Sequence, residues 1–245
     1  MKNNLTKQET RIIPEQAPAK FYAQHLKPYE FLRNDSAGKR VLELGCGDGY
    51  GSFYLAKIAS RAVGIDYEEK VILQAKNKYR HPNLSFLCMN ATNLGFKDNS
   101  FDIICSFQVI EHIPENKLML YLSEIKRVLS PGGRFYLSTL NLEHNMKSPL
   151  TYKKNSAHCK EFKVDELKKL LLDIFPAVRI YGLRLAPKHS FYQRLKKIGL
   201  LNLLPQRINP VNRFYNRITT EDFIVTAGNL KKASDFICTC TKSPH

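Results

Sequence analysis

Short apolar runs alternate with helix-like patterns from residue 40 to the end of the chain. The apolar runs predict β-strands at 40–44, 62–65, 84–89, 101–106, 134–139, 177–185 and 235–241. Apolar positions spaced three and four residues apart predict helices at 50–60, 68–79, 117–129 and 164–175. Because strands that alternate with helices form parallel sheets with helices on both faces, we expect an α/β protein.

The segments outside this alternation are an N-terminal extension and a late insertion. Residues 1–39 form the extension, with helical character at 19–32, and residues 40–245 are expected to form one domain. Pro131-Gly132-Gly133 is expected to end the helix at 117–129. A basic insertion at about 186–226 separates the last two predicted strands.

A glycine-rich segment, VLELGCGDGYGS, joins the first strand to the first helix. Gly45, Gly47 and Gly49 allow a tight turn and let a ligand approach the main chain, as in nucleotide-binding turns of doubly wound sheets. Glu43 before the turn and Asp48 within it would repel a pyrophosphate and attract a cationic ligand. S-adenosylmethionine, which carries a sulfonium and an ammonium group, is such a ligand.

An acid follows the turn at the end of the second predicted strand. Asp66 lies about 20 residues beyond the first glycine, where an acid accepts hydrogen bonds from ribose hydroxyls. The alternative is a structural role, as the N-cap of the helix that begins near Glu68. The glycine turn before it favours the ribose role.

The order of the motifs along the chain resembles the class I S-adenosylmethionine-dependent methyltransferases. VLELGCGDGYGS is followed by AVGID, LCMNATNLGFKDNSFDIICSFQVIEHI and EIKRVLSPGGRFYLSTLN, which together cover most of residues 40–142. The resemblance implies S-adenosylmethionine as cofactor and a Rossmann-like, doubly wound, seven-stranded sheet, mostly parallel with an antiparallel last strand. It also implies cofactor-binding roles for Glu43, Gly45, Gly47, Gly49, Asp66, Tyr67, Asn90, Ala91 and Phe107.

Within the motifs, individual positions imply particular contacts. Asn90 and Ala91 match an Asp-Ala pair that contacts adenine, and asparagine keeps an acceptor oxygen for the adenine amine. Phe107 and Gln108 match positions beside the methionine moiety. Further segments, Arg11-Ile-Ile-Pro14, His25-Leu-Lys-Pro-Tyr29 and Asn155-Ser-Ala-His158-Cys-Lys-Glu161-Phe, are similar to a bacterial subgroup associated with saccharide biosynthesis.

A hydroxyl acceptor needs a base to remove its proton. His158, in a polar loop after the fifth predicted strand, is the leading candidate for this base, and His112 is the second. Each has a structural alternative, as a residue that orders its loop or packs beside a helix. Acids and histidines do not cluster at ligand spacing, so no metal is expected.

The net charge of +16 indicates an anionic partner. No acidic residue lies between Asp173 and Glu221, and the basic segment 174–220 suits several partners. It could bind the phosphates of a nucleotide-linked or lipid-linked saccharide, contact a membrane surface, bind RNA, or simply form a solvated helix. For the segment itself, an ordinary helix with solvated lysines is preferred, and binding of a substrate anion comes next. Among partners of the protein, the order is a small-molecule acceptor, then peripheral membrane contact, with nucleic acid less favoured.

Location and function follow from the same features. No apolar run is long enough to span a membrane and no signal peptide is apparent, so the expected location is the cytoplasm, with the inner-membrane surface as an alternative. The six cysteines fit no zinc pattern and are expected to be buried free thiols. The predicted activity is O-methylation of a saccharide or another small hydroxylated acceptor. The alternatives are RNA methylation and a non-catalytic binding subunit.

Overall fold

The protein forms a single mixed sheet in the computed structural model, which describes residues 11–146, 152–189 and 214–244. The eight strands lie in the order β3-β2-β1-β4-β5-β8-β6-β7. They are β1 (Arg40–Leu44), β2 (Arg61–Asp66), β3 (Leu84–Cys88), β4 (Phe101–Phe107), β5 (Leu129–Leu140), β6 (Ala177–Leu185), β7 (Phe223–Thr226) and β8 (Asp235–Thr241). The main helices are α1 (Ala19–Leu32), α2 (Tyr50–Ala56), α3 (Glu69–Lys78), α4 (Leu118–Val128), α5 (Leu142–Asn145) and α6 (Val164–Leu172).

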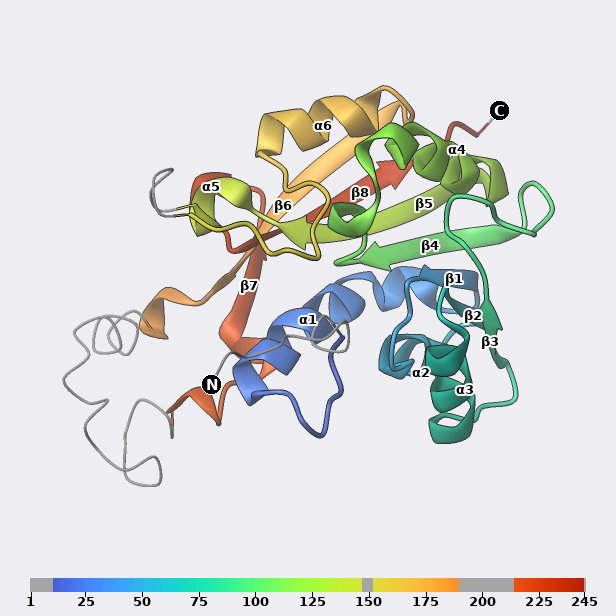
Figure 1. Ribbon diagram of the computed structural model, residues 1–245, viewed down its shortest axis with the longest axis horizontal. Coiled ribbons are helices and arrows are strands. Elements are labelled where there is room, and N and C mark those ends of the chain that lie inside the picture. Colours follow the sequence, from blue (N-terminus) through green and yellow to red (C-terminus); the bar gives the residue numbers. More distant parts are fainter. Residues whose placement is uncertain (1–10, 147–151, 190–213, 245) are drawn as a thin grey trace.

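Helices cover both faces of the sheet, which is why its central strands are almost continuously apolar. On one face, α4 and α6 bury Tyr121, Ile125 and Leu171 against the sheet. On the other face lie α1, α2 and α3, and Tyr29 and Leu55 are part of the core there (Figure 1). The predicted two-sided α/β architecture is confirmed.

The strand directions confirm a mostly parallel sheet whose last strand is antiparallel. Strands β3, β2, β1, β4 and β5 are parallel to their neighbours, and β8 lies antiparallel between β5 and β6. The expected count of seven strands is wrong by one, because β7 pairs antiparallel with β6 inside the segment expected to be a basic insertion. Most of that insertion, residues 190–213, lies outside the described residues.

The Pro131-Gly132-Gly133 sequence lies inside a strand and does not separate a helix from one. Helix α4 ends at Val128 and β5 begins at once with Leu129, which pairs with Phe101. The register between β4 and β5 then shifts between Phe101 and Ile103. The tripeptide therefore bends the start of β5, because Gly132 takes a positive φ of 70° there.

The structure also corrects one expectation about the cysteines. Cys46, Cys105, Cys238 and Cys240 are buried free thiols as expected, but Cys88 is exposed at the end of β3, as is Cys159 in a loop. None of the helices in the described part of the chain is long and apolar enough to cross a bilayer.

Candidate functional site

The glycine turn lies at the carboxyl end of β1, between that strand and α2. Gly45, Gly47 and Gly49 all have positive φ, at 69°, 51° and 94°. A Cβ on Gly45 would come within 2.5 Å of Cγ2 of Val109, so the loop after β4 packs directly on the turn. In front of Gly47, a Cβ would meet only the Arg11 side chain, at 4.0 Å. The main chain at Gly47 is therefore open to a ligand, which fits the predicted cofactor site.

Asp66 lies at the end of β2 beside this turn, as its predicted ribose role requires. Its carboxylate accepts hydrogen bonds from the main-chain nitrogens of Gly47, at 3.2 Å, and Glu68, at 3.1 Å. Arg11 of the N-terminal segment also lies 3.3 Å from Asp66 and 2.9 Å from Glu68. The acid thus joins the turn to the start of α3 and faces a guanidinium that a ribose would have to meet or displace.

The two acids expected to attract a cationic ligand are already engaged. Glu43 is buried behind the turn, where Tyr29 and Ser52 donate hydrogen bonds to its carboxylate. Burial raises the pKa of Glu43 to about 7, and the two hydroxyl donors partly offset this rise. Asp48 forms an ion pair with Lys78 at 3.0 Å. Because both acids already have partners in the protein, the attraction for a cationic ligand predicted from the sequence holds only in part. Glu43 instead supports the glycine turn from the buried side.

The predicted adenine side of the site lies after β3. The side-chain oxygen of Asn90 accepts hydrogen bonds from the main-chain nitrogen and the hydroxyl of Thr92, both at 2.9 Å. The Asn90 oxygen that was predicted to accept from the adenine amine therefore already has two donors within the protein. Ala91 follows in the same turn, and the Tyr67 ring is exposed at the rim with Arg11 5.8 Å from its centre.

The predicted methionine side lies after β4. Phe107 packs edge-to-face on Tyr29, with ring centres 4.8 Å apart. Gln108 has a φ of 57°, a left-handed conformation that non-glycine residues adopt mainly where the surroundings enforce it. Its main-chain nitrogen donates to the carbonyl of Ser138 at 2.9 Å, which fixes the turn that leads to His112.

Both histidines predicted as bases lie at the same edge of the sheet, with ring centres 5.0 Å apart. Nδ1 of His158 lies 2.7 Å from Oε1 of Glu161, and Nδ1 of His112 lies 2.9 Å from the carbonyl of Ala157. Since a carboxylate and a carbonyl can only accept, each Nδ1 carries the proton. In the neutral form of such a ring, the lone pair lies on Nε2.

Glu111, which was not among the predicted site residues, belongs to the same cluster. Its side chain is 1% exposed and accepts a hydrogen bond from Thr139 at 3.0 Å. Burial raises the pKa of Glu111 to about 8. Burial lowers the pKa of His112, the hydrogen bond to the Ala157 carbonyl partly offsets this, and the neighbouring His158 lowers the pKa further.

Spacing along the chain indicated no metal site, whereas folding brings ligand atoms together. Glu111, His112 and His158 each place one potential ligand atom within 4.8 Å of the others. These groups come from two loops, since His112 and its partner Ala157 are 45 positions apart. Two features of the sequence could have indicated this cluster: the adjacent acid and histidine at Glu111-His112, and the acid Glu161 three positions after His158.

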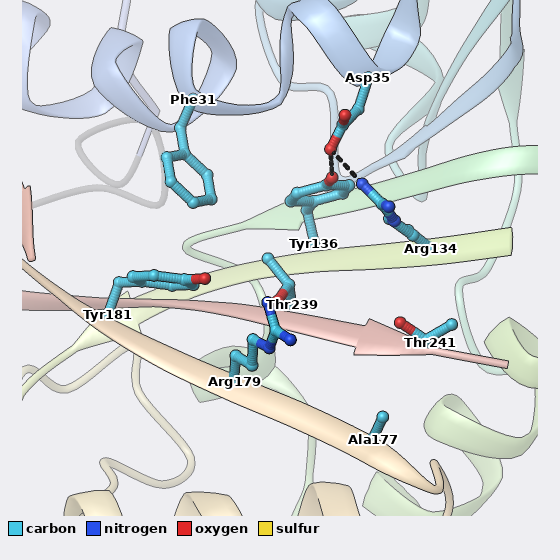
Figure 2. Close-up of a pocket in the computed structure, with 9 residues that line it drawn as sticks. All are labelled: Phe31, Asp35, Arg134, Tyr136, Ala177, Arg179, Tyr181, Thr239 and Thr241. Atoms are coloured by element: carbon cyan, nitrogen blue, oxygen red, sulfur yellow. Dashed lines mark hydrogen bonds and ion pairs between the residues drawn. The ribbon is translucent and has the colours of Figure 1, made fainter. Parts of the chain in front are cut away.

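A second concave region lies toward the amino ends of β5 and β6, away from the carboxyl end of β1 that holds the glycine turn. Figure 2 shows this cleft between the segment after α1 and strands β5, β6 and β8. Asp35 accepts hydrogen bonds there from Arg134 and Tyr136. Arg134 and Tyr136 pair with the last residues of the antiparallel β8, so the cleft lies away from the edge that holds the glycine turn. None of the predicted site residues lines it.

Comparisons with known proteins agree with this arrangement. A family model described as a methyltransferase domain matches residues 42–137. A Mycolicibacterium smegmatis protein, named as a probable S-adenosylmethionine-dependent methyltransferase, is 36% identical over 165 residues, which cover 66% of this chain and 61% of the relative. This chain therefore spans less than two thirds of that relative's length.

Two further matches extend the comparison. The phthiotriol/phenolphthiotriol dimycocerosates methyltransferase of Mycobacterium tuberculosis is 38% identical over 103 residues, covering 41% of this chain and 37% of the relative. The crystal structure of an S-adenosylmethionine-dependent methyltransferase from Thermotoga maritima superposes with a TM-score of 0.61 at 18% identity, covering 92% of each chain. The structural match shows that the fold is shared.

Proposed function

This chain belongs to the class I S-adenosylmethionine-dependent methyltransferases, and from that premise we propose that it methylates a hydroxyl group of a small acceptor. S-adenosylmethionine, the cofactor of the family, supplies a methyl group bound to a positively charged sulfur. The residues that suit this cofactor are the open main chain at Gly47, the Asp66 carboxylate and the amide of Asn90. We assign the main chain at Gly47 to direct contact with the cofactor, Asp66 to its ribose and Asn90 to its adenine.

The observation that carries the hydroxyl acceptor is the pairing of His158 with Glu161 at the cofactor edge. A hydroxyl must lose its proton as its oxygen is methylated, and a neutral imidazole with a bare Nε2 can accept it. The carboxylate of Glu161 holds Nδ1 and stabilises the imidazolium that results. An amine or thiolate acceptor would have less need of such a base.

The acceptor class that we propose is a saccharide or a lipid-linked molecule with a free hydroxyl. The relative named for phthiotriol and phenolphthiotriol dimycocerosates indicates that a similar domain can serve a lipid acceptor. The net charge of +16 suits an acceptor that carries phosphate, and also suits contact with an anionic membrane surface.

A tritiated-methyl assay tests this function. The full chain would be incubated with labelled S-adenosylmethionine and, separately, with nucleotide sugars, lipid extracts and RNA. We expect label in a saccharide or lipid fraction, with the labelled bond stable to conditions that hydrolyse methyl esters. Label confined to RNA would overturn the proposed acceptor class, and binding of cofactor without transfer to any fraction would favour a non-catalytic binding subunit.

A further inference from the structure

The cluster of Glu111, His112 and His158 has the composition of a metal centre. It offers a carboxylate and two imidazoles, and one potential ligand atom from each lies within 4.8 Å of the others. Two histidines and one carboxylate bind transition-metal cations such as Zn²⁺ and Fe²⁺, and leave further positions open. We propose that these three side chains hold a divalent transition-metal cation of this kind.

The hydrogen bonds behind the two rings are those that metal-bound histidines make. In metal sites the nitrogen that does not bind the metal usually donates to a carboxylate or a main-chain carbonyl, which fixes the tautomer and the ring direction. Here His158 donates to Glu161 and His112 donates to the carbonyl of Ala157. Tyr152 in turn donates to the second oxygen of Glu161, so this carboxylate is itself held in place.

The two loops that carry the ligands are joined through the main chain. The carbonyl of Glu111 accepts hydrogen bonds from the main-chain nitrogens of Cys159, at 2.7 Å, and Lys160, at 3.1 Å. Lys160 is anchored further by ion pairs to Glu115 and Glu166. Main-chain hydrogen bonds and the ion pairs of Lys160 therefore help to hold the two loops together, in addition to the contact of the His112 ring with Ala157. Ligand atoms around Zn²⁺ lie roughly 3.4 Å apart, given bonds of about 2.1 Å, so small side-chain rotations would close the site.

The position of the cluster suggests what the cation would do, if the hydroxyl acceptor proposed above is correct. It lies at the edge where Gln108 leads out of β4, next to the predicted methionine side of the cofactor. A cation held there has positions left for an acceptor oxygen, and it lowers the pKa of a hydroxyl that it binds. With the cation bound, His158 would be a ligand and no longer the base proposed above, and the hydroxyl bound to the cation would lose its proton to solvent water.

Cobalt binding tests the site without any acceptor. Untagged full-length protein would be stripped with a chelator and titrated with Co²⁺ at pH 7.5, with visible absorption reporting ligation. We expect one Co²⁺ per chain, displaced by Zn²⁺ but not by millimolar Mg²⁺, which prefers oxygen ligands. Displacement by Mg²⁺, or no absorption change at all, would overturn the proposal.

Matched variants locate the binding. Glu111→Gln and His158→Gln should each weaken Co²⁺ binding by at least about 100-fold, and Glu161→Gln by about 10-fold to 100-fold through loss of the supporting hydrogen bond. His81→Gln, at the opposite edge of the sheet, is the control and should bind as the parent does. Isothermal titration with S-adenosylhomocysteine verifies that each variant is folded.

The outcomes separate this inference from the proposed function. Undiminished Co²⁺ binding in Glu111→Gln and His158→Gln would overturn the site. Co²⁺ binding that depends on both residues would support the site even if no hydroxyl acceptor were ever methylated, and in that case only the proposed acceptor class would fail.

Discussion

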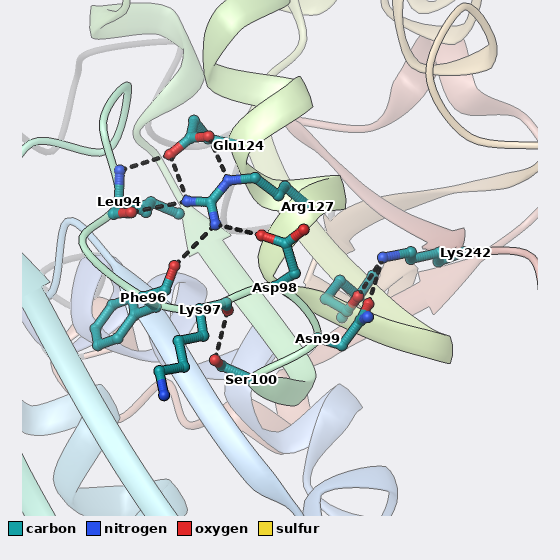
Figure 3. Close-up of polar contacts among 10 residues, drawn as sticks. Leu94, Phe96, Lys97, Asp98, Asn99, Ser100, Glu124, Arg127 and Lys242 are labelled. Atoms are coloured by element: carbon teal, nitrogen blue, oxygen red, sulfur yellow. Dashed lines mark hydrogen bonds and ion pairs between the residues drawn. The ribbon is translucent and has the colours of Figure 1, made fainter.

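Two polar clusters in this protein use the same kinds of side chain in opposite ways. Arg127 in α4 donates every N–H of its guanidinium to the protein, to Glu124, Asp98 and the carbonyls of Leu94 and Phe96, as Figure 3 shows. In the cluster of Glu111, His112 and His158, the hydrogen bonds described for each ring involve only Nδ1. The guanidinium of the first cluster is fully engaged, whereas each ring of the second cluster has one nitrogen with no described hydrogen bond, and its three side chains each offer a ligand atom within 4.8 Å of the others.

The difference teaches how to tell a structural cluster from a functional one. The Arg127 cluster fixes the loop that leads to β4, and Glu124 also accepts from the main-chain nitrogen of Leu94 at 2.7 Å. All of its bonding capacity serves that loop. In the histidine cluster, the Nδ1 hydrogen bonds orient the two rings. This is the arrangement expected of side chains that must meet a ligand.

The largest effect that we predict is on catalysis. His158→Gln should lower the rate of methyl transfer by about 10²-fold to 10⁴-fold, since the acceptor proton loses its base or the cation loses a ligand. Cofactor affinity, measured by isothermal titration, should remain within about twofold, because the contacts described for His158 are with Glu161 and His112 and not with the glycine turn. A rate close to that of the parent would show that the histidine cluster is as purely structural as the Arg127 cluster.

The next effect concerns Glu43, a buried acid whose carboxylate accepts hydrogen bonds from Tyr29 and Ser52. Its pKa is raised to about 7, so between pH 4.5 and pH 7 the native state holds a proton that the unfolded chain has lost. Rising pH through this window therefore destabilises the native state. Glu43→Gln has no proton to lose, so its stability relative to the parent should grow from pH 4.5 to pH 7, by at most about 3 kcal/mol, and then level off.

Urea unfolding at a series of pH values measures this difference. Tyr29→Phe is a useful companion, because it removes one donor to Glu43 and leaves the acid in place. A stability difference between Glu43→Gln and the parent that is the same at every pH would show that folding does not change the pKa of Glu43.

Asp66 should show both structural and functional behaviour, because it holds the glycine turn and is also assigned to the ribose. Asp66→Ala removes the carboxylate assigned to the ribose and should weaken S-adenosylhomocysteine binding by about 10-fold to 100-fold, as expected for lost hydrogen bonds to a charged group. Asp66→Asn, which keeps an acceptor oxygen, should lose less. Equal affinity of all three proteins would mean that Asp66 serves only the turn and Arg11.

The smallest effect should come from the cluster with the most bonds. Arg127→Ala removes ion pairs that are partly exposed to solvent, so the expected loss of stability is only about 1–2 kcal/mol, seen as a melting temperature lower by a few degrees. Methyl transfer at 25 °C and cofactor affinity should not change. A fall in activity larger than the fall in folded protein would mean that the loop before β4 is coupled to the catalytic edge.

Sequence reasoning was most successful where structure depends on neighbouring residues. The strands, the glycine turn and α1 follow local patterns, and their predicted positions are confirmed to within a few residues. Strand β7 was missed because its four residues follow a long basic segment and, among the residues that the structure describes, pair with β6 alone. Short strands of this kind carry too little pattern to be recognised without their partner.

The site shows the same limit more sharply. The positions of Gly47 and Asp66 were predictable because they sit in one β-α-β unit. The pairings of Asp48 with Lys78 and of Arg11 with Asp66 were not, because they join residues 30 and 55 positions apart. Glu111 was not predicted as a site residue for the same reason, because its partners Cys159 and Lys160 lie in a loop that approaches it only in the folded protein.

The main-chain link between Glu111 and the loop of Cys159 and Lys160 has a consequence for protein engineering. The main-chain hydrogen bonds between the two loops involve no side-chain atoms, so they remain when the three side chains are exchanged, and among the hydrogen bonds described between the loops only that of His112 with Ala157 is lost. Carboxylates in place of the imidazoles would convert the cluster toward oxygen-binding cations, and apolar residues would line a pocket for uncharged guests. The same frame would thus accommodate new chemistry through a handful of replacements, which makes this edge a practical starting point for directed evolution.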